Sequence, residues 1–161
     1  YQNIEGGTQQ IVQDLILEIS NLPIANLVVM FLFFFVGGYL LYASLYAAIG
    51  AAVDSETDTQ QFMLPILMPL ILAIYVGFFT VIENPHGTVS QVFSYIPFTS
   101  PVVMLMRIPF GVPVWQQILS LVLLFITFFG TVWFAAKIYK VGILMYGKKA
   151  SYSEIFKWLK Y

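Results

Sequence analysis

Charged residues are scarce in this chain. Only 9% of its 161 residues are charged, whereas 60% are hydrophobic. A soluble domain carries about 25% charged residues, so this composition cannot cover a surface that faces water. The formal net charge is only −1, which gives no basic surface for a nucleic-acid partner. The sequence therefore predicts an integral membrane protein that lies in a lipid bilayer.

Cysteine is absent and histidine occurs once, as His86. Disulfides and thiolate metal sites are thereby excluded, and a single histidine without further ligands does not indicate a metal site. A serine hydrolase needs a base beside its nucleophile, and no nucleophile motif accompanies His86. The phosphate-binding pattern G-x-x-x-x-G-K-[ST] is also missing. We therefore expect no catalytic, cofactor-binding or metal-binding residues, and the chain is not expected to be an enzyme.

Long windows without any charge locate the membrane spans. They cover residues 19–53, 59–82 and 108–136. About 20 apolar residues in a helix cross the hydrocarbon core, which is about 30 Å thick. Barrel strands are ruled out because they are about ten residues long and alternate between polar and apolar side chains. We expect one all-α transmembrane domain over residues 1–161, with spans at 26–52, 62–82 and 114–136.

Prolines interrupt the stretch between the second and third spans. They stand at Pro85, Pro97, Pro101, Pro109 and Pro113. Proline ends or kinks a helix, so the apolar pieces between these residues are too short to span. We expect two short helices that form a re-entrant hairpin over residues 88–112 and dip into the outer leaflet.

The residues expected to shape this hairpin are Pro97, Thr99, Ser100, Pro101 and Arg107. Ser100 is a candidate N-cap for the second short helix, with Pro101 in its first turn. Arg107 falls near the end of that helix, where a cation complements the helix dipole. Its long side chain is expected to reach the outer headgroups.

The two ends of the chain differ in charge. Residues 8–22 form an amphipathic pattern, which predicts a helix on the membrane surface or against a neighbouring domain. Residues 137–161 carry six of the seven basic residues. The positive-inside rule therefore places this tail, with an interfacial helix, in the cytoplasm.

Small residues recur in the second half of the first span. Such residues let helices approach closely in lipid, where packing drives association. We expect them to contact another helix of the chain or a second copy of it, forming a dimer. The candidate packing residues are Gly37, Gly38, Ala43, Ala47, Gly50 and Ala51.

Three segments together resemble a known family. They read GGYLLYASLYAAIGAAVDSETDTQQ from residue 37, YIPFTSPVVMLMRIPFG from residue 95 and AAKIYKVGILMYGKK from residue 135. In this order they resemble type-two ABC exporter permeases, and most closely the sodium-efflux permeases of the bacterial inner membrane. The resemblance implies six spans, of which this chain corresponds to the last three. It also implies a separate ATPase subunit that binds ATP, and two permease copies around one translocation path.

The acidic loop after the first span allows two interpretations. It contains Asp54, Glu56, Asp58, Gln60 and Gln61. Charges are costly in lipid, so the carboxylates are sufficient to end one span and begin the next. The resemblance adds a contact with the ATPase subunit at this loop.

The main hypothesis is therefore a permease subunit of an ABC exporter. One alternative is a membrane assembly or anchoring module without a translocation path, and another is a small ion channel. No ionisable residue lies near the middle of any predicted span, which makes a self-contained ion-coupled carrier a weaker hypothesis. A copurifying ATPase would distinguish the exporter from both alternatives.

Overall fold

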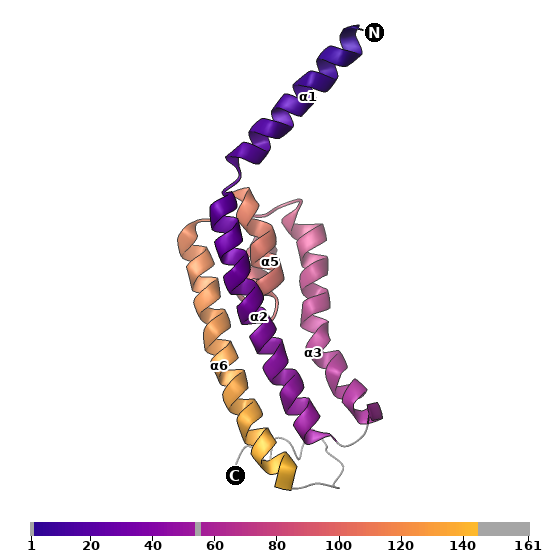
Figure 1. Ribbon diagram of the computed structural model, residues 1–161, viewed down its shortest axis with the longest axis vertical. Coiled ribbons are helices and arrows are strands. Elements are labelled where there is room, and N and C mark those ends of the chain that lie inside the picture. Colours follow the sequence, from indigo (N-terminus) through magenta and orange to yellow (C-terminus); the bar gives the residue numbers. More distant parts are fainter. Residues whose placement is uncertain (1, 54–55, 145–161) are drawn as a thin grey trace.

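The computed structural model describes residues 2–53 and 56–144, which form helices and short connections without a strand. Three long helices run alongside one another (Figure 1): α2 (Ile24–Ala52), α3 (Glu56–Val76) and α6 (Val114–Leu144). Each contains a window that is long and apolar enough to cross a membrane. The predicted all-α membrane fold with three candidate spans is confirmed. The observed helices extend beyond the predicted spans, since α3 begins at Glu56 and α6 continues to Leu144.

Helices α2 and α6 form the main packing pair of the bundle. Gly37 of α2 faces Leu124 of α6, where an added Cβ would come within 2.9 Å of the leucine Cδ2. Further along the pair, Ser44 Oγ donates a hydrogen bond of 2.8 Å to Thr131 Oγ1. Small residues at such contacts let the two backbones approach closely in lipid.

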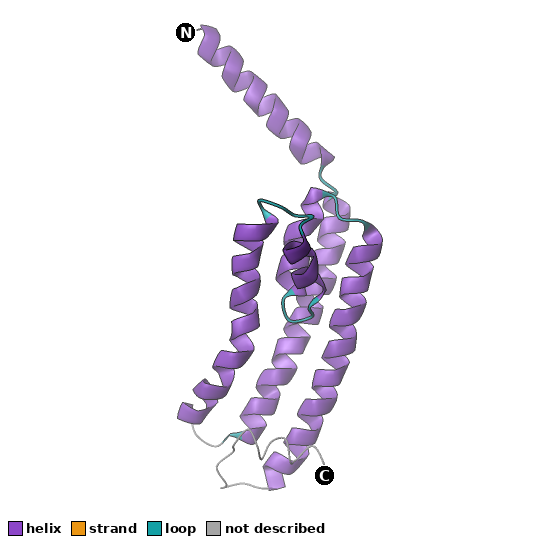
Figure 2. Cartoon of the chain, turned by 180° about the vertical axis from the view of Figure 1, so that it is seen from behind, coloured by secondary structure: helices purple, strands orange, loops and turns teal. Residues whose placement is uncertain are grey.

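Helix α3 contains Pro65 and Pro69 and continues into a π-helix, η1 (Gly77–Val81). Each proline removes a backbone donor, and Figures 1 and 2 show the first turns of α3 leaning away from α2. At the other end, Gly77 of η1 faces the sulfur of Met106. The bend and the π-helix therefore separate a loosely packed end of α3 from an end that packs closely against the short helices.

The segment between α3 and α6 folds into the hairpin, which comprises α4 (Thr88–Tyr95), α5 (Ser100–Arg107) and the 3-10 turn η2 (Ile108–Phe110). Figure 2 shows its short helices against the long ones. The two ends of the hairpin lie close together, because His86 Nε2 lies 3.1 Å from the carbonyl oxygen of Phe110. We call this end of the bundle, where α2 and α6 begin, the hairpin end.

The tip of the hairpin lies level with the middle of α2. Tyr42 Oη donates a hydrogen bond of 2.7 Å to the carbonyl oxygen of Phe98, which lies between α4 and α5. Tyr42 is 18 residues past Ile24, which corresponds to about 27 Å along the helix. Pro101 touches α2 nearby, at Gly38. The two short helices therefore fill the space beside α2 over half its length.

The N-terminus of α5 differs from the expected cap. The cap residue is Thr99 rather than Ser100, and its side chain makes no capping hydrogen bond. Thr99 Oγ1 instead donates 2.5 Å to the carbonyl oxygen of Phe93, and Ser100 Oγ donates 3.5 Å to that of Pro97. The expectation of a Ser100 cap was wrong because both hydroxyls donate to carbonyls of the preceding turns, where α4 ends. Pro101 does occupy the first turn of α5.

Helix α1 (Gln2–Asn21) projects from the hairpin end of the bundle (Figure 1). It begins earlier than the predicted residues 8–22. Its apolar side chains from Ile11 onward are exposed, because α1 does not pack against the rest of this chain. The surface-helix interpretation stays a prediction. The interfacial helix expected within residues 137–161 falls mostly on residues 145–161, which lie outside the described residues.

Candidate functional site

Buried polar side chains gather in the hairpin and on the part of α6 beside it. Among the described residues they are Ser90, Ser94, Thr99, Ser100, Arg107, Gln117 and Ser120. All of them belong to the hairpin or to the first turns of α6. A polar group that leaves water must find a partner within the protein, and this requirement is stricter in lipid. We call this group, together with the polar residues bonded to it, the polar cluster.

Arg107 holds the polar cluster together. Its side chain is fully buried, and its Nε donates a hydrogen bond of 2.7 Å to the carbonyl oxygen of Pro85. Its Nη1 donates 2.6 Å to Ser94 Oγ, and its Nη2 donates 3.4 Å to Gln116 Oε1. One guanidinium therefore connects the loop before α4, α4 itself and α6.

No carboxylate in the described part of the chain pairs with Arg107. Burial lowers the pKa of its guanidinium, and the nearby Tyr95 partly opposes this effect. An arginine side chain nevertheless stays protonated in proteins. The charge is therefore stabilised by neutral oxygen acceptors alone.

The expectation that Arg107 reaches the outer headgroups was wrong. Its side chain points into the hairpin because a backbone carbonyl, a serine and a glutamine from three segments converge there. A charge buried among several acceptors costs less than one facing the hydrocarbon.

Further hydrogen bonds extend the polar cluster to α2. Ser120 Oγ of α6 donates 2.6 Å to the carbonyl oxygen of Ser94, and Gln117 Nε2 donates 2.8 Å to that of Val112. Asn26 Nδ2 of α2 donates 2.9 Å to Gln117 Oε1. In the described part of the chain, every buried side-chain nitrogen and oxygen has a partner. The hydrogen bonds of the cluster thus connect α2, the hairpin and α6.

An open groove lies between α2, α3 and α5. Its volume is about 700 Å³. Helix α2 contributes aromatic side chains, namely Phe31, Phe34, Phe35, Tyr39, Tyr42 and Tyr46. The remaining walls consist of Gly38, Leu67, Leu70, Pro101, Val102, Leu105 and Met106. We call it the aromatic groove; no charged residue lines it.

The predicted packing residues of α2 are in different environments. Gly37 and Gly38 are buried against α6 and α5, respectively. Ala47 and Gly50 are exposed, and nothing lies within 4 Å of a Cβ added at Gly50. The remaining two, Ala43 and Ala51, are half-buried. A neighbouring row of small residues, spaced four apart and including Ala48 and Ala52, packs against Ile138 instead.

The acidic loop is only partly described. Asp54 lies outside the described residues, while Glu56 and Asp58 fall in the first turn of α3 without described side chains. Gln60 and Gln61 are exposed on α3, at the end opposite the hairpin. The structure does not bring the described residues of this loop together with the polar cluster or the aromatic groove.

Several residues of the site were not singled out from the sequence. Ser94, Gln116, Gln117 and Ser120 become important only because α4 and α6 meet around Arg107. One signal was available, since Gln116 and Gln117 open an otherwise apolar helix. A pair of amides at that place indicates internal hydrogen bonding at membrane depth.

Comparison with known proteins identifies a family. The family model described as ABC-2 family transporter protein matches residues 10–137. No curated protein and no solved structure matches the chain. The matched region includes α2, α3 and the hairpin entirely, together with most of α6.

Proposed function

Because the chain belongs to the ABC-2 family of transporter proteins, we propose that it lines part of the translocation path of an ATP-driven exporter. The family match over residues 10–137 carries this conclusion, and it makes the chain an ABC transporter permease subunit in a membrane. The six-span arrangement that the resemblance implies would supply the rest of the path. We place the protein in the bacterial inner membrane, with the tail beyond α6 in the cytoplasm, because that tail carries most of the lysines.

The energy would come from a separate ATPase subunit, with which permeases of the ABC-2 family usually pair. The acidic loop is our candidate contact for that subunit, at the end of the bundle away from the hairpin. The alternative role for its carboxylates, ending one span and starting the next, requires no partner.

Reconstitution with the copurifying ATPase tests this function. We expect ATP-dependent movement of a probe across liposomes that contain the full-length protein, and no movement when the ATPase carries an inactive P-loop lysine. Reversing charge at Asp54 and Glu56 to lysine should slow transport several-fold while the complex still assembles. Glu83→Lys, at the hairpin end, is the matched control and should leave the rate unchanged. Probe movement without ATP or an ATPase would instead favour the ion channel.

Two substrate classes are worth testing in that assay. The resemblance to sodium-efflux permeases suggests Na⁺. The aromatic groove favours an apolar or amphipathic molecule, because hard cations need several oxygen ligands and the groove walls supply only tyrosine hydroxyls. Radioactive sodium and an uncharged fluorescent lipid analogue are suitable probes for the two classes.

We also propose that the hairpin is re-entrant from the outer side. The contact between His86 and Phe110 and the depth of Phe98 beside Tyr42 support this topology. The chain lacks native cysteine, so single cysteines can be introduced without background. His86→Cys and Phe110→Cys should both react quickly with an impermeant thiol reagent added outside, and Ile96→Cys near the tip should react at least about 10-fold more slowly because lipid shields it. Labelling of only one of the two end positions from outside would contradict the topology.

The face of α2 that contains Ala47 and Gly50 is our candidate contact for a second copy of the chain. Both residues are exposed, and small residues are typical of helix contacts in lipid.

A further inference from the structure

We propose that the first part of α3, residues 56–64, is a lever that bends at Pro65 and Pro69 against the rest of the bundle. The three long helices differ in the feature that permits such a motion. Helices α2 and α6 contain no proline within their bounds, whereas α3 contains both of these prolines. Most of the acidic loop belongs to the lever, so the two would move together.

The two prolines weaken one side of α3 over two successive turns. In a regular helix each backbone N–H donates to the carbonyl oxygen four residues earlier, and proline has no N–H. Pro65 therefore deprives the carbonyl oxygen of Gln61 of its regular donor, and Pro69 does the same to the carbonyl oxygen of Pro65. Both missing bonds lie on the same side, because residues four apart are neighbours on a helix. Bending at these turns breaks fewer hydrogen bonds than it would in α2 or α6.

Beyond the prolines, α3 and η1 are held firmly against the hairpin. Ala73 of α3 and Val81 of η1 are fully buried in one hydrophobic cluster with Val103 of α5. Gly77 lies so close to Met106 of α5 that an added Cβ would meet the methionine sulfur. The hairpin is in turn hydrogen-bonded to α6 and, through it, to α2. The second part of α3 therefore belongs to the same packed unit as the hairpin.

The lever is packed much less tightly. Among its residues whose side chains the structure describes, none is fully buried, and Gln60 and Leu64 are exposed. A groove of about 310 Å³ lies between the lever, α2 and α6, and its walls include Phe62, Ala52 and Ile138. Segments with few buried apolar contacts are the ones that move most easily. The space beside the lever and the bend behind it thus allow this end of α3 to move by itself.

Helix geometry gives the size of the expected movement. Gln60 lies nine residues before Pro69, which corresponds to about 14 Å along the helix. A change of about 20° in the bend, the size of a sharp helix kink, displaces Gln60 by about 5 Å. Movement towards α2 narrows the groove beside Phe62. Only the link to transport rests on the proposed function, since an ATPase subunit that contacts the acidic loop would push or pull the lever.

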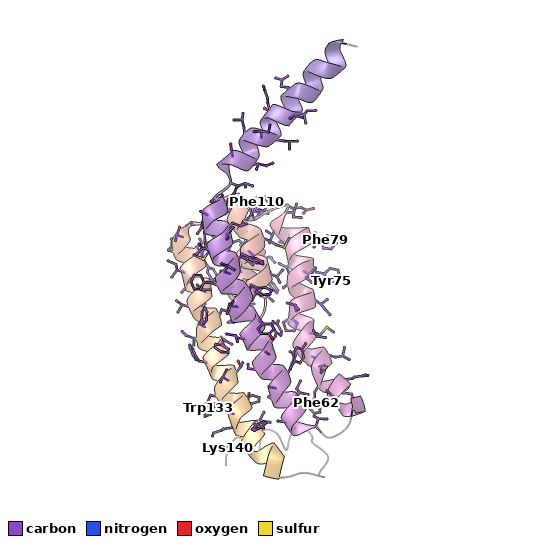
Figure 3. The ribbon with its side chains drawn as sticks, viewed as in Figure 1. Phe62, Tyr75, Phe79, Phe110, Trp133 and Lys140 are labelled. Atoms are coloured by element: carbon purple, nitrogen blue, oxygen red, sulfur yellow. The ribbon has the colours of Figure 1, made fainter. Side chains whose placement is uncertain are left out.

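Double electron–electron resonance tests the hinge without ATP or the ATPase. The chain has no cysteine, so pairs of spin labels can be attached at introduced cysteines. The lever pair joins Gln60→Cys to Lys140→Cys on α6, and the reference pair joins Tyr75→Cys, beyond the prolines, to the same position on α6. All three side chains are exposed, and Tyr75 and Lys140 are labelled in Figure 3.

The full-length labelled protein is diluted with unlabelled protein in nanodiscs, so that only distances within one chain are measured. We expect the distances of the lever pair to spread over about 5 Å more than those of the reference pair.

Pro65→Ala combined with Pro69→Ala is the variant that removes the hinge. Alanine restores both backbone donors and favours a helix interior. The spread of the lever pair should fall to that of the reference pair, while an unchanged reference pair shows that the bundle remains folded. The matched control combines Leu64→Ala with Met68→Ala, because both side chains are exposed on the same turns and both residues already have a backbone N–H. It should leave the lever pair as it is in the wild-type protein.

Three results would overturn the inference: an equal spread of the two pairs in the wild-type protein, an unchanged lever pair in the double proline variant, or equal narrowing in the control variant. A helix of another span or of a second copy that fills the groove would hold the lever and produce the first result. A hinge at η1 instead of the prolines would produce the second.

The complex with the ATPase subunit tests the link to transport separately. Binding of a non-hydrolysable ATP analogue should shift the lever pair by about 5 Å and the reference pair by less than about 2 Å. An ATPase that binds but leaves the lever pair unshifted would overturn this link. If no ATPase binds at all, the proposed function fails, whereas the hinge stands on the measurements without nucleotide.

Discussion

Arg107→Met is expected to lower the thermal unfolding temperature by on the order of 10 °C. Methionine keeps the length of the side chain but leaves Pro85 O, Ser94 Oγ and Gln116 Oε1 without their donor. A hydrogen bond to a charged group contributes about 1.5–3 kcal/mol, and relief of the desolvated charge offsets part of that loss. We therefore expect a net loss of about 2–5 kcal/mol, where each kcal/mol corresponds to about 2–4 °C for a chain of this size.

Lys140→Met is the matched control, because Lys140 is exposed on α6 far from the hairpin (Figure 3). It should shift the unfolding temperature by no more than about 2 °C. Arg107→Lys should fall between the two, since an ammonium cannot present the arginine fork to three separated acceptors. Tryptophan fluorescence during heating in detergent would measure all three. A fully stable Arg107→Met protein would mean that desolvation of the guanidinium cancels its hydrogen bonds.

Gly38→Leu is expected to separate the hairpin from α2. A Cβ at Gly38 would come 2.9 Å from Pro101 Cγ, closer than real Cβ atoms approach, and 3.0 Å from Pro101 Cβ, which is also a tight contact. The proline ring is rigid and lies in the first turn of α5, so the helix itself must move. Overpacking costs about 1–3 kcal/mol for small insertions, and leucine adds three more carbons. We expect a loss of about 3 kcal/mol or more, measured as a fall in unfolding temperature.

Other glycines of the bundle supply the controls. Gly50→Ala should raise stability by about 0.5–1 kcal/mol, because nothing lies within 4 Å and alanine favours a helix interior. Gly77→Ala meets only the flexible end of Met106, so it should cost less than Gly38→Ala. If Gly38→Leu and Gly50→Leu were equally stable, the close contact between α2 and α5 would not exist in the membrane.

The hairpin shows how far sequence reasoning extends in this protein. The prolines from Pro85 to Pro113 predict two short helices, and the structure contains α4 and α5 between them. How far α4 and α5 extend along α2 did not follow from this pattern. It depends on Tyr42 and Gly38, which contact residues 56 and 63 positions away along the chain.

The small residues of α2 also show that sequence alone does not decide which face of a helix packs. Two ridges of equal spacing run along the helix, one through Ala47 and the other through Ala48. Periodicity cannot decide between them, because each would suit a close helix contact. The position of α6 decides: Ala48 is buried near Ile138, while Ala47 stays exposed.

The sequence by itself determined the membrane location and the three spans of this protein. These follow from the scarcity of charge and the length of its apolar windows. Both are local properties of the sequence, and they decide whether a helix is stable in the bilayer. Only the tertiary structure decided the surroundings of Arg107 and the walls of the aromatic groove. Both depend on side chains from helices that are distant in sequence, and no local pattern encodes which acceptors or aromatic rings a fold will bring to one place.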